Sequence, residues 1–326
     1  MDPDTILRGL DAVTQFTHLP VFHILGQHSG DLSIWSWFPD PFVIMAVIGV
    51  SWWYLRAIGP QRETYAESSP VSRWRVGCFF GSLVTIILAL LSPLEPLSDG
   101  YLLSAHMIQH LMLTIMFPIL LFVGIPRWLY LPFTTWRGGA PWRIWMQVTR
   151  PVPAFVLFQV PFALSHLPIW YDMTLRQPQV HVLEHWIYMA GAMIGWWAIV
   201  APDRQLGRLQ PLLAVLFLFV STIPGQVVGA MITYSEGPLY PTYAAARRVW
   251  DIGVMEDQEL AGLIMWVGTS TIYLGALALV FFRWAANENR KETQHYVVRT
   301  PSASAAMAAP ATSVGTPSDS AAPAEG

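Results

Sequence analysis

Apolar residues run along this chain in seven long stretches, separated by short segments rich in charge, proline and tryptophan. Each stretch has roughly the 18–24 residues that a helix needs to cross a bilayer. The pattern therefore predicts an all-α, polytopic membrane protein built as a seven-transmembrane-helix bundle with short loops. The predicted spans are residues 41–58, 75–92, 102–123, 152–168, 181–200, 211–232 and 259–282.

Composition agrees with a membrane protein, because 54% of the residues are hydrophobic and only 12% are charged. We expect three parts: an extracytoplasmic N-terminal segment (1–40), the membrane domain (41–285) and a disordered cytoplasmic tail (286–326). The tail prediction rests on its Ala, Pro and Ser, which offer little apolar surface to pack. The net charge of −3 is too small to indicate a nucleic-acid partner.

The basic residues predict the orientation. Fourteen of the 18 Lys and Arg residues fall in one set of alternating loops and four in the other. Since cytoplasmic loops carry the excess of positive charge, the N-terminus is expected outside and the C-terminus in the cytoplasm. A multi-pass membrane protein with its N-terminus outside follows from this reading.

Five histidines stand at the predicted outer ends of the spans, and they are the strongest candidates for chemistry. His106/His110 and His181/His185 are i,i+4 pairs, so each pair presents two imidazoles from one helix face. His166 ends the fourth span. Imidazole is costly near hydrocarbon and is a common ligand for soft and borderline metals. We therefore predict that all five histidines bind a metal: His106, His110, His166, His181 and His185.

Four further residues are predicted to support this site. Met107 follows His106 directly, Met265 lies near the start of the seventh span, and thioether with imidazole favours Cu(I) over Zn(II). Asp257 enters the seventh span on the same side, where an unpaired carboxylate would be expensive. Glu184 is adjacent to His185 but points off the face of the pair. Copper is accordingly the expected cofactor.

Three other interpretations fit the same residues. The letters HVLEH match the inverted zinc-peptidase pattern H-x-x-E-H, which would make the chain a membrane-embedded zinc hydrolase with Glu184 as general base. Two histidines from different spans could ligate a b-type haem. Alternatively, the bundle is a non-catalytic assembly scaffold, and its histidines hold helix ends together. The role of His18, His23 and His28 stays open.

Five motifs in order make the chain resemble the CtaG family of cytochrome c oxidase assembly factors, seven-helix membrane proteins linked to caa-type oxidases. The resemblance covers about residues 40–285. It is carried by AHMIQHLMLTIMFPILLFVGIP, SHLPIWYD, HVLEHWIYMAGAMIGWW, PLYPTY and EDQELAGLIMW.

The resemblance implies a factor, rather than an enzyme, that helps to build a haem–copper oxidase in the bacterial inner (plasma) membrane by copper supply to a catalytic subunit. The five histidines and Asp257 match the family's motif residues. The implied partners are cytochrome c oxidase subunits and the lipid bilayer, with periplasmic copper chaperones as further candidates.

Overall fold

The computed structural model describes residue 37 and residues 39–134, 139–248 and 250–299. These residues form helices and connecting loops without a β-strand, so the all-α prediction is confirmed. The predicted outer segment 1–40, with His18, His23 and His28, lies almost entirely outside the described residues. The chain divides into two compact units, Met1–Val280 and Phe281–Gly326, and the candidate site lies in the first.

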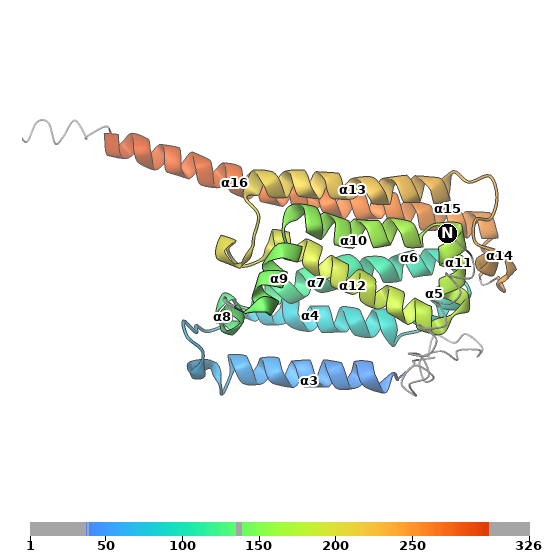
Figure 1. Cartoon of the computed structure of the whole chain (residues 1–326), viewed down its shortest axis with the longest axis horizontal. Coiled ribbons are helices and arrows are strands. Elements are labelled where there is room, and N and C mark those ends of the chain that lie inside the picture. Colours follow the sequence, from blue (N-terminus) through green and yellow to red (C-terminus); the bar gives the residue numbers. More distant parts are fainter. Residues whose placement is uncertain (1–36, 38, 135–138, 249, 300–326) are drawn as a thin grey trace, which may run out of the picture. The chain divides into compact units, whose positions relative to one another are not determined.

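Long helices lie side by side in the first unit (Figure 1). Five helices of the described chain are long and apolar enough to cross a membrane, which makes this a multi-pass membrane protein. They are α3 (Pro41–Ile58), α4 (Arg73–Leu90), the combined helix Leu103–Gly124, α13 (Pro211–Thr233) and the combined helix Val254–Glu292.

The predicted count of seven spans is met only in part. The fourth prediction falls on α10 (Pro151–Ser165), which joins α9 (Ala140–Val148) at a bend of 73°, and this pair brings the candidates to six at most. The fifth falls on α12 (Pro178–Val200), which has 23 residues but is less apolar. His181, Glu184 and His185 lower its hydropathy, so the proposed site residues are what weaken its membrane signal.

Short helices occupy several connections where the sequence led us to expect only loops. Most of them begin at a proline or with a short amphipathic segment. Each helix is too short to produce a recognisable hydrophobicity pattern. They are η1 (Arg62–Thr64), α5 (Leu94–Gly100), α8 (Arg127–Thr134), α11 (Pro168–Arg176), η3 (Arg204–Leu206) and α14 (Pro241–Ala245).

The helix that carries His106 and His110 contains a single wide turn. Helix α6 (Leu103–Leu111) passes into the π-turn η2 (Met112–Met116) and then α7 (Phe117–Gly124). Pro118 has no N–H to give to the carbonyl of Thr114, four residues earlier. The indole Nε1 of Trp196 on α12 donates to that carbonyl at 2.9 Å. The break thus locks α12 to the His106 helix.

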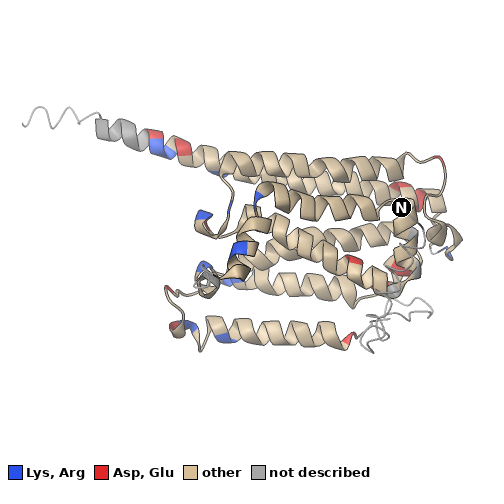
Figure 2. Cartoon of the chain, viewed as in Figure 1, with Lys and Arg blue, Asp and Glu red and all other residues tan. Residues whose placement is uncertain are grey.

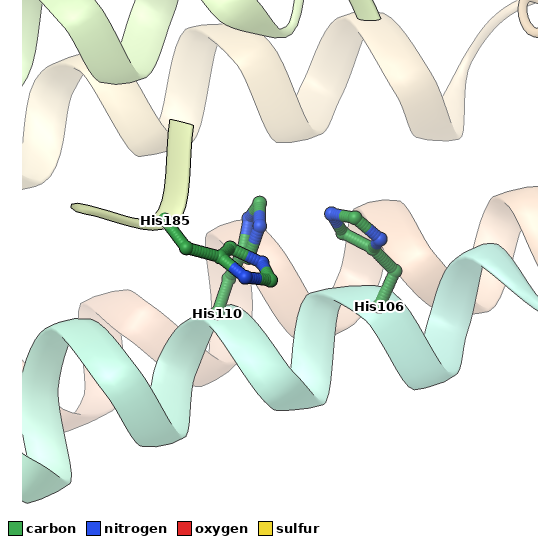
Figure 3. A group of neighbouring side chains, drawn as sticks. All are labelled: His106, His110 and His185. Carbon is green, nitrogen blue, oxygen red and sulfur yellow. The ribbon is translucent and has the colours of Figure 1, made fainter. Parts of the chain in front are cut away.

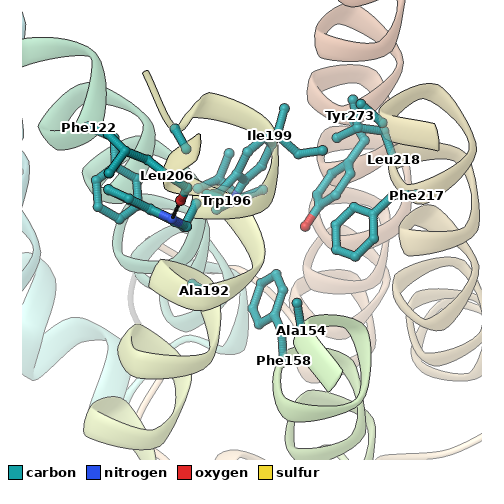
Figure 4. Packing of buried hydrophobic residues seen from close by; sticks show 14 of the residues in the cluster. Phe122, Ala154, Phe158, Ala192, Trp196, Ile199, Leu206, Phe217, Leu218 and Tyr273 are labelled. Atoms are coloured by element: carbon teal, nitrogen blue, oxygen red, sulfur yellow. Dashed lines mark hydrogen bonds between the residues drawn. The ribbon is translucent and has the colours of Figure 1, made fainter. Parts of the chain in front are cut away.

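An aromatic core below this break holds the same helices together. Trp196 stacks obliquely on Tyr273 with ring centroids 5.1 Å apart, and Phe158 of α10 lies in the same buried cluster (Figure 4). Since lipid tails are as apolar as these side chains, close packing and hydrogen bonds, rather than water exclusion, stabilise the contact.

Helix α13 approaches the last bundle helix most closely at glycine. The last helix of the bundle consists of α15 (Val254–Leu263), the π-turn η4 (Ile264–Gly268) and α16 (Thr269–Arg299). A Cβ on Gly262 would lie 2.1 Å from Oγ1 of Thr233 and 2.8 Å from the carbonyl of Gly229. Only glycine allows this spacing, which sets α15, and Asp257 on it, against the site.

Charge separates along the bundle. Figure 2 shows Lys and Arg gathered at the end that holds α8 and α9, whereas α5 and α15 carry their acidic residues at the opposite end. At the basic end, Arg127 lies 2.6 Å from Glu67 and 2.7 Å from Asp203, which joins three connections. These pairs are partly exposed, so solvent screens them and each contributes little to stability.

The second unit differs from the predicted disordered tail. Helix α16 continues to Arg299, so residues 286–299 are helical, and Lys291 and Glu288 pair at 2.9 Å. This stretch is rich in strong helix formers, namely Ala, Glu, Lys, Arg and Gln. The predicted disorder rested only on the lack of apolar surface. Residues 300–326 are outside the described chain.

Candidate functional site

The five predicted histidines come together at one end of the bundle. His106 and His110 project from α6, His181 and His185 from α12, and His166 follows the last residue of α10. Ring centroids are 4.2 Å apart within the first pair and 4.3 Å within the second. His106 lies 5.4 Å from His181, and His110 lies 5.6 Å from His185. The two i,i+4 pairs therefore face each other.

Two groups within the cluster have the geometry to hold a metal ion. The first is His106, His110 and His185, all buried, and Figure 3 shows the rings of His110 and His185 side by side with His106 one turn along α6. The second is Asp99, His106 and His181. In each group the ligand atoms lie within 4.8 Å of one another.

Several imidazole nitrogens of this cluster have no hydrogen-bond partner within the described structure. They are Nε2 of His106, His166 and His185, and both ring nitrogens of His110. All four side chains are at most 7% exposed. A buried polar group without a partner costs on the order of 1–3 kcal/mol, so such groups are rarely left together in a protein interior.

His166 lies beside the two metal-competent groups. Its ring centroid is 5.8 Å from that of His110. Its Nδ1 lies 2.6 Å from the carbonyl of Phe162, an acceptor, so Nδ1 carries the proton and the Nε2 lone pair is free. This tautomer suits a ligand, and the ring must move toward His110 to join a shared ion.

Asp257 supports the site through the backbone. Its carboxylate accepts hydrogen bonds from the backbone N–H groups of Leu103 (2.8 Å) and Ser104 (3.1 Å) and from the Ser104 hydroxyl (2.5 Å). These are the first residues of α6, where four N–H groups lack helical partners. Asp257 thus fixes the start of α6, and with it the orientation of His106 and His110, although we expected it to pair with an imidazole.

Glu184 has partners of its own, as its position off the face of the pair predicts. Its Oε1 accepts a hydrogen bond from the hydroxyl of Tyr188 at 2.9 Å, and its Oε2 lies 3.8 Å from Nδ1 of His181. A carboxylate beside the distal nitrogen of an imidazole is a common arrangement around metal ligands, where it fixes the tautomer.

Met107 and Met265 are buried close to His110. Met107 is fully buried and Met265 is 1% exposed, and both belong to one apolar cluster with Tyr171 and Tyr243. Together with His110 they line a cavity of about 20 Å³, enough for one water molecule. The described packing accounts for both methionines, and both residues also line the space next to His110.

Sequence reasoning missed three residues that shape the site. Asp99 of α5 lies 3.1 Å from Nε2 of His181. Gln109 donates to the carbonyl of Ala89 at 2.9 Å and accepts from Ser98 at 3.0 Å, which holds α5 on α6. Tyr243 lies 3.3 Å from Nδ1 of His106. In the sequence, Asp99 is one of several acidic residues in the predicted outer loops, and nothing singles it out. Tyr243, in PLYPTY, has no regular spacing that would link it to His106.

The imidazole of His181 shifts the pKa of the Asp99 carboxyl, which lies outside the spans. Burial raises the pKa of the Asp99 carboxyl, but the neighbouring imidazole of His181 more than offsets this and lowers that pKa to about 2. Asp99 is therefore ionised at neutral pH and presents a full negative charge to His181.

Comparison with known proteins identifies the family. The family model described as cytochrome c oxidase caa3 assembly factor matches residues 52–287, which include all five histidines and Asp257. The chain belongs to this family. Membership confirms the resemblance found in the motifs.

The curated proteins that match the chain share about a quarter of its residues over the matched segments. An uncharacterised protein of Mycobacterium leprae is 24% identical over 248 residues, which cover 69% of this chain and 36% of the relative. Another, of Mycobacterium bovis, is 26% identical over 211 residues, covering 59% and 32%. The chain thus spans about a third of the length of the curated relatives it matches. No solved structure matches the chain.

Replacing Asp257 with alanine should loosen the first turn of α6. The loss removes three hydrogen bonds to N–H and hydroxyl groups, so we expect a destabilisation of about 2 kcal/mol. Hydrogen exchange of the amides of Leu103 and Ser104 in the detergent-purified protein should become faster. The control is Glu259→Ala, which removes an exposed carboxylate from the same helix. Equal exchange in the two variants would contradict the capping role.

Proposed function

We propose that this oxidase assembly factor holds a copper ion, as Cu(I), at its histidine cluster and passes it on during assembly. One observation carries the proposal: imidazole nitrogens from three helical segments are buried together without hydrogen-bond partners in the described structure. A metal ion bound by these nitrogens would offset the cost of burying them. The role is binding and transfer rather than catalysis.

The ligand types favour copper. Imidazole suits copper and zinc alike, but a buried, all-imidazole group next to thioether sulfur suits Cu(I) best. The group His106, His110 and His185 is of this kind, and Met107 and Met265 border the cavity beside His110. Nitrogen–metal bonds of about 2.0 Å would draw these ligand atoms, now within 4.8 Å of one another, closer together.

The proposed membrane topology would put the cluster on the side from which copper would arrive. We infer that α10 and α12 also cross, which makes seven spans, since both pack between helices that are long enough to cross (Figure 1). The basic end holding α8 and α9 then faces the cytoplasm of a bacterial cell, as the positive-inside rule requires. The histidine cluster, at the opposite end of the first unit, then lies outside.

This placement suggests the partners. A periplasmic copper chaperone would deliver the ion to the outer end of the bundle, and a cytochrome c oxidase subunit in the same bilayer would receive it. Oxidase assembly is the family's role, and the copper route through the cluster is our proposal.

Metal analysis of the full-length protein tests the proposal. Purified in detergent and exposed to Cu(I) under reducing conditions, the wild type should retain about one equivalent of copper, as expected for one shared ligand set. The double variant His110→Ala/His185→Ala should lose it at unchanged yield. His295→Ala, the same substitution at a histidine outside the five, is the control.

The same samples separate the other interpretations. Zinc in place of copper, together with hydrolytic activity lost in Glu184→Gln, would favour the hydrolase. A Soret band would favour haem. If the wild type holds neither metal nor haem, and histidine variants are less abundant, only the scaffold interpretation remains. That result would contradict the copper proposal.

Single cysteines test the topology. In a Cys78→Ser background, Glu236→Cys in the loop after α13 should react with a membrane-impermeant maleimide in intact spheroplasts. Arg204→Cys, between α12 and α13, should react only after permeabilisation, because it lies at the cytoplasmic end. Both residues are exposed, so access to the reagent depends only on the side of the membrane. Labelling of Arg204→Cys in intact spheroplasts would overturn the orientation.

A further inference from the structure

The contact between Asp99 and His181 needs a cation. Oδ1 of Asp99 and Nε2 of His181 are 3.1 Å apart, and Glu184 approaches the other nitrogen of the same ring at 3.8 Å. If the His181 proton faces Glu184, two acceptor atoms face each other across 3.1 Å. Ligands of one tetrahedral ion bound at about 2.0 Å are about 3.3 Å apart. The spacing therefore fits two ligands of one metal ion, and a proton on His181 is the competing explanation.

His106 is prepared to complete this group. The hydroxyl of Tyr243 donates its proton to the carbonyl of Ser98, so its oxygen can accept from Nδ1 of His106, 3.3 Å away. The network thus assigns the proton to Nδ1 and leaves the lone pair on Nε2, the nitrogen without a partner. This one lone pair can bind only one ion at a time.

The two groups that share His106 lie at different depths. The side chain of Asp99 is 34% exposed, His181 is 7% exposed and His106 is fully buried, so this group leads inward from the surface. The group of His106, His110 and His185 is buried throughout. Gln109 holds α5 on α6 through Ser98, which keeps Asp99 beside His181.

We propose that the cluster has two metal positions joined by His106, so that an ion enters at the Asp99 position and moves to the His110 position. The Asp99 position consists of Asp99, His106 and His181, and the His110 position consists of His106, His110 and His185. The inference rests on the proposed copper function and adds the route by which the ion enters.

The move is an exchange of ligands without redox change. The bonds from the ion to Oδ1 of Asp99 and to His181 break, those to His110 and His185 form, and the bond to His106 persists throughout. A carboxylate is a poor ligand for Cu(I), so Cu(I) favours the all-imidazole position at equilibrium. Zn(II) accepts carboxylate and imidazole together, and it is therefore the probe for the Asp99 position.

The experiment compares rate and affinity in the full-length, detergent-purified protein. Cu(I) is supplied anaerobically from its complex with a chromogenic chelator, and Zn(II) binding is measured by calorimetry. We expect Asp99→Asn to slow Cu(I) loading about fivefold or more and to weaken Zn(II) binding about tenfold, with Cu(I) affinity within about twofold of wild type. His110→Ala should show the reverse: Cu(I) affinity falls and Zn(II) binding persists.

Two controls guard against a structural explanation. Asp251→Asn makes the same change at an exposed residue outside the cluster and should behave as wild type. Asp99→Glu keeps the carboxylate and should restore most of the loading rate. If Asp99→Asn lowers the yield or the melting temperature, the loading rate of Asp99→Glu becomes the test. A restored rate supports the proposal, and a slow rate contradicts it.

Each remaining outcome contradicts a different statement. Unchanged Cu(I) loading and Zn(II) binding in Asp99→Asn would mean that only a proton joins Asp99 to His181, and the copper site would stand without a second position. Equal losses of Cu(I) rate and affinity would make Asp99 part of a single site. Two equivalents of copper at saturation would exclude the shared His106. A wild type that binds no Cu(I) would overturn the proposed function itself.

Discussion

Inside a bilayer, a polar group that finds no partner within the protein finds none in its surroundings either, and this constraint organises the bundle. The carbonyl of Thr114, freed by Pro118, is taken by the indole of Trp196. The N–H groups at the start of α6 are taken by Asp257. The fold meets this constraint at each of these points and leaves it unmet at the histidine cluster, which is why we place the function there.

The same hydrogen bonds position the cluster. Trp196 ties α12 to the helix of His106 and His110, and Asp257 brings α15 to the beginning of that helix. Four of the imidazoles thus stand on helices that are hydrogen-bonded to their neighbours, which suits the proposed holding of an ion until another protein takes it. Asp99, on the short helix α5, is the part nearest the surface.

Much of the site could be predicted from the sequence because its signals are periodic. The i,i+4 spacing of His106/His110 and His181/His185 predicts two facing pairs, which the structure brings together. The prediction fell short where contacts depend on tertiary packing. The role of Asp257 depends on its contact with the neighbouring helix α6, and Asp99 reaches His181 only because Gln109 holds α5 in place. No local pattern encodes these contacts.

The most direct test of the account is X-ray absorption at the copper edge of the reduced, copper-loaded protein. We predict a first shell of about three nitrogen atoms at about 2.0 Å, with the outer-shell scattering of imidazole rings. Replacing His110 and His185 with alanine should remove that imidazole signal. A shell of sulfur or oxygen without imidazole scattering would contradict copper binding by the histidine cluster.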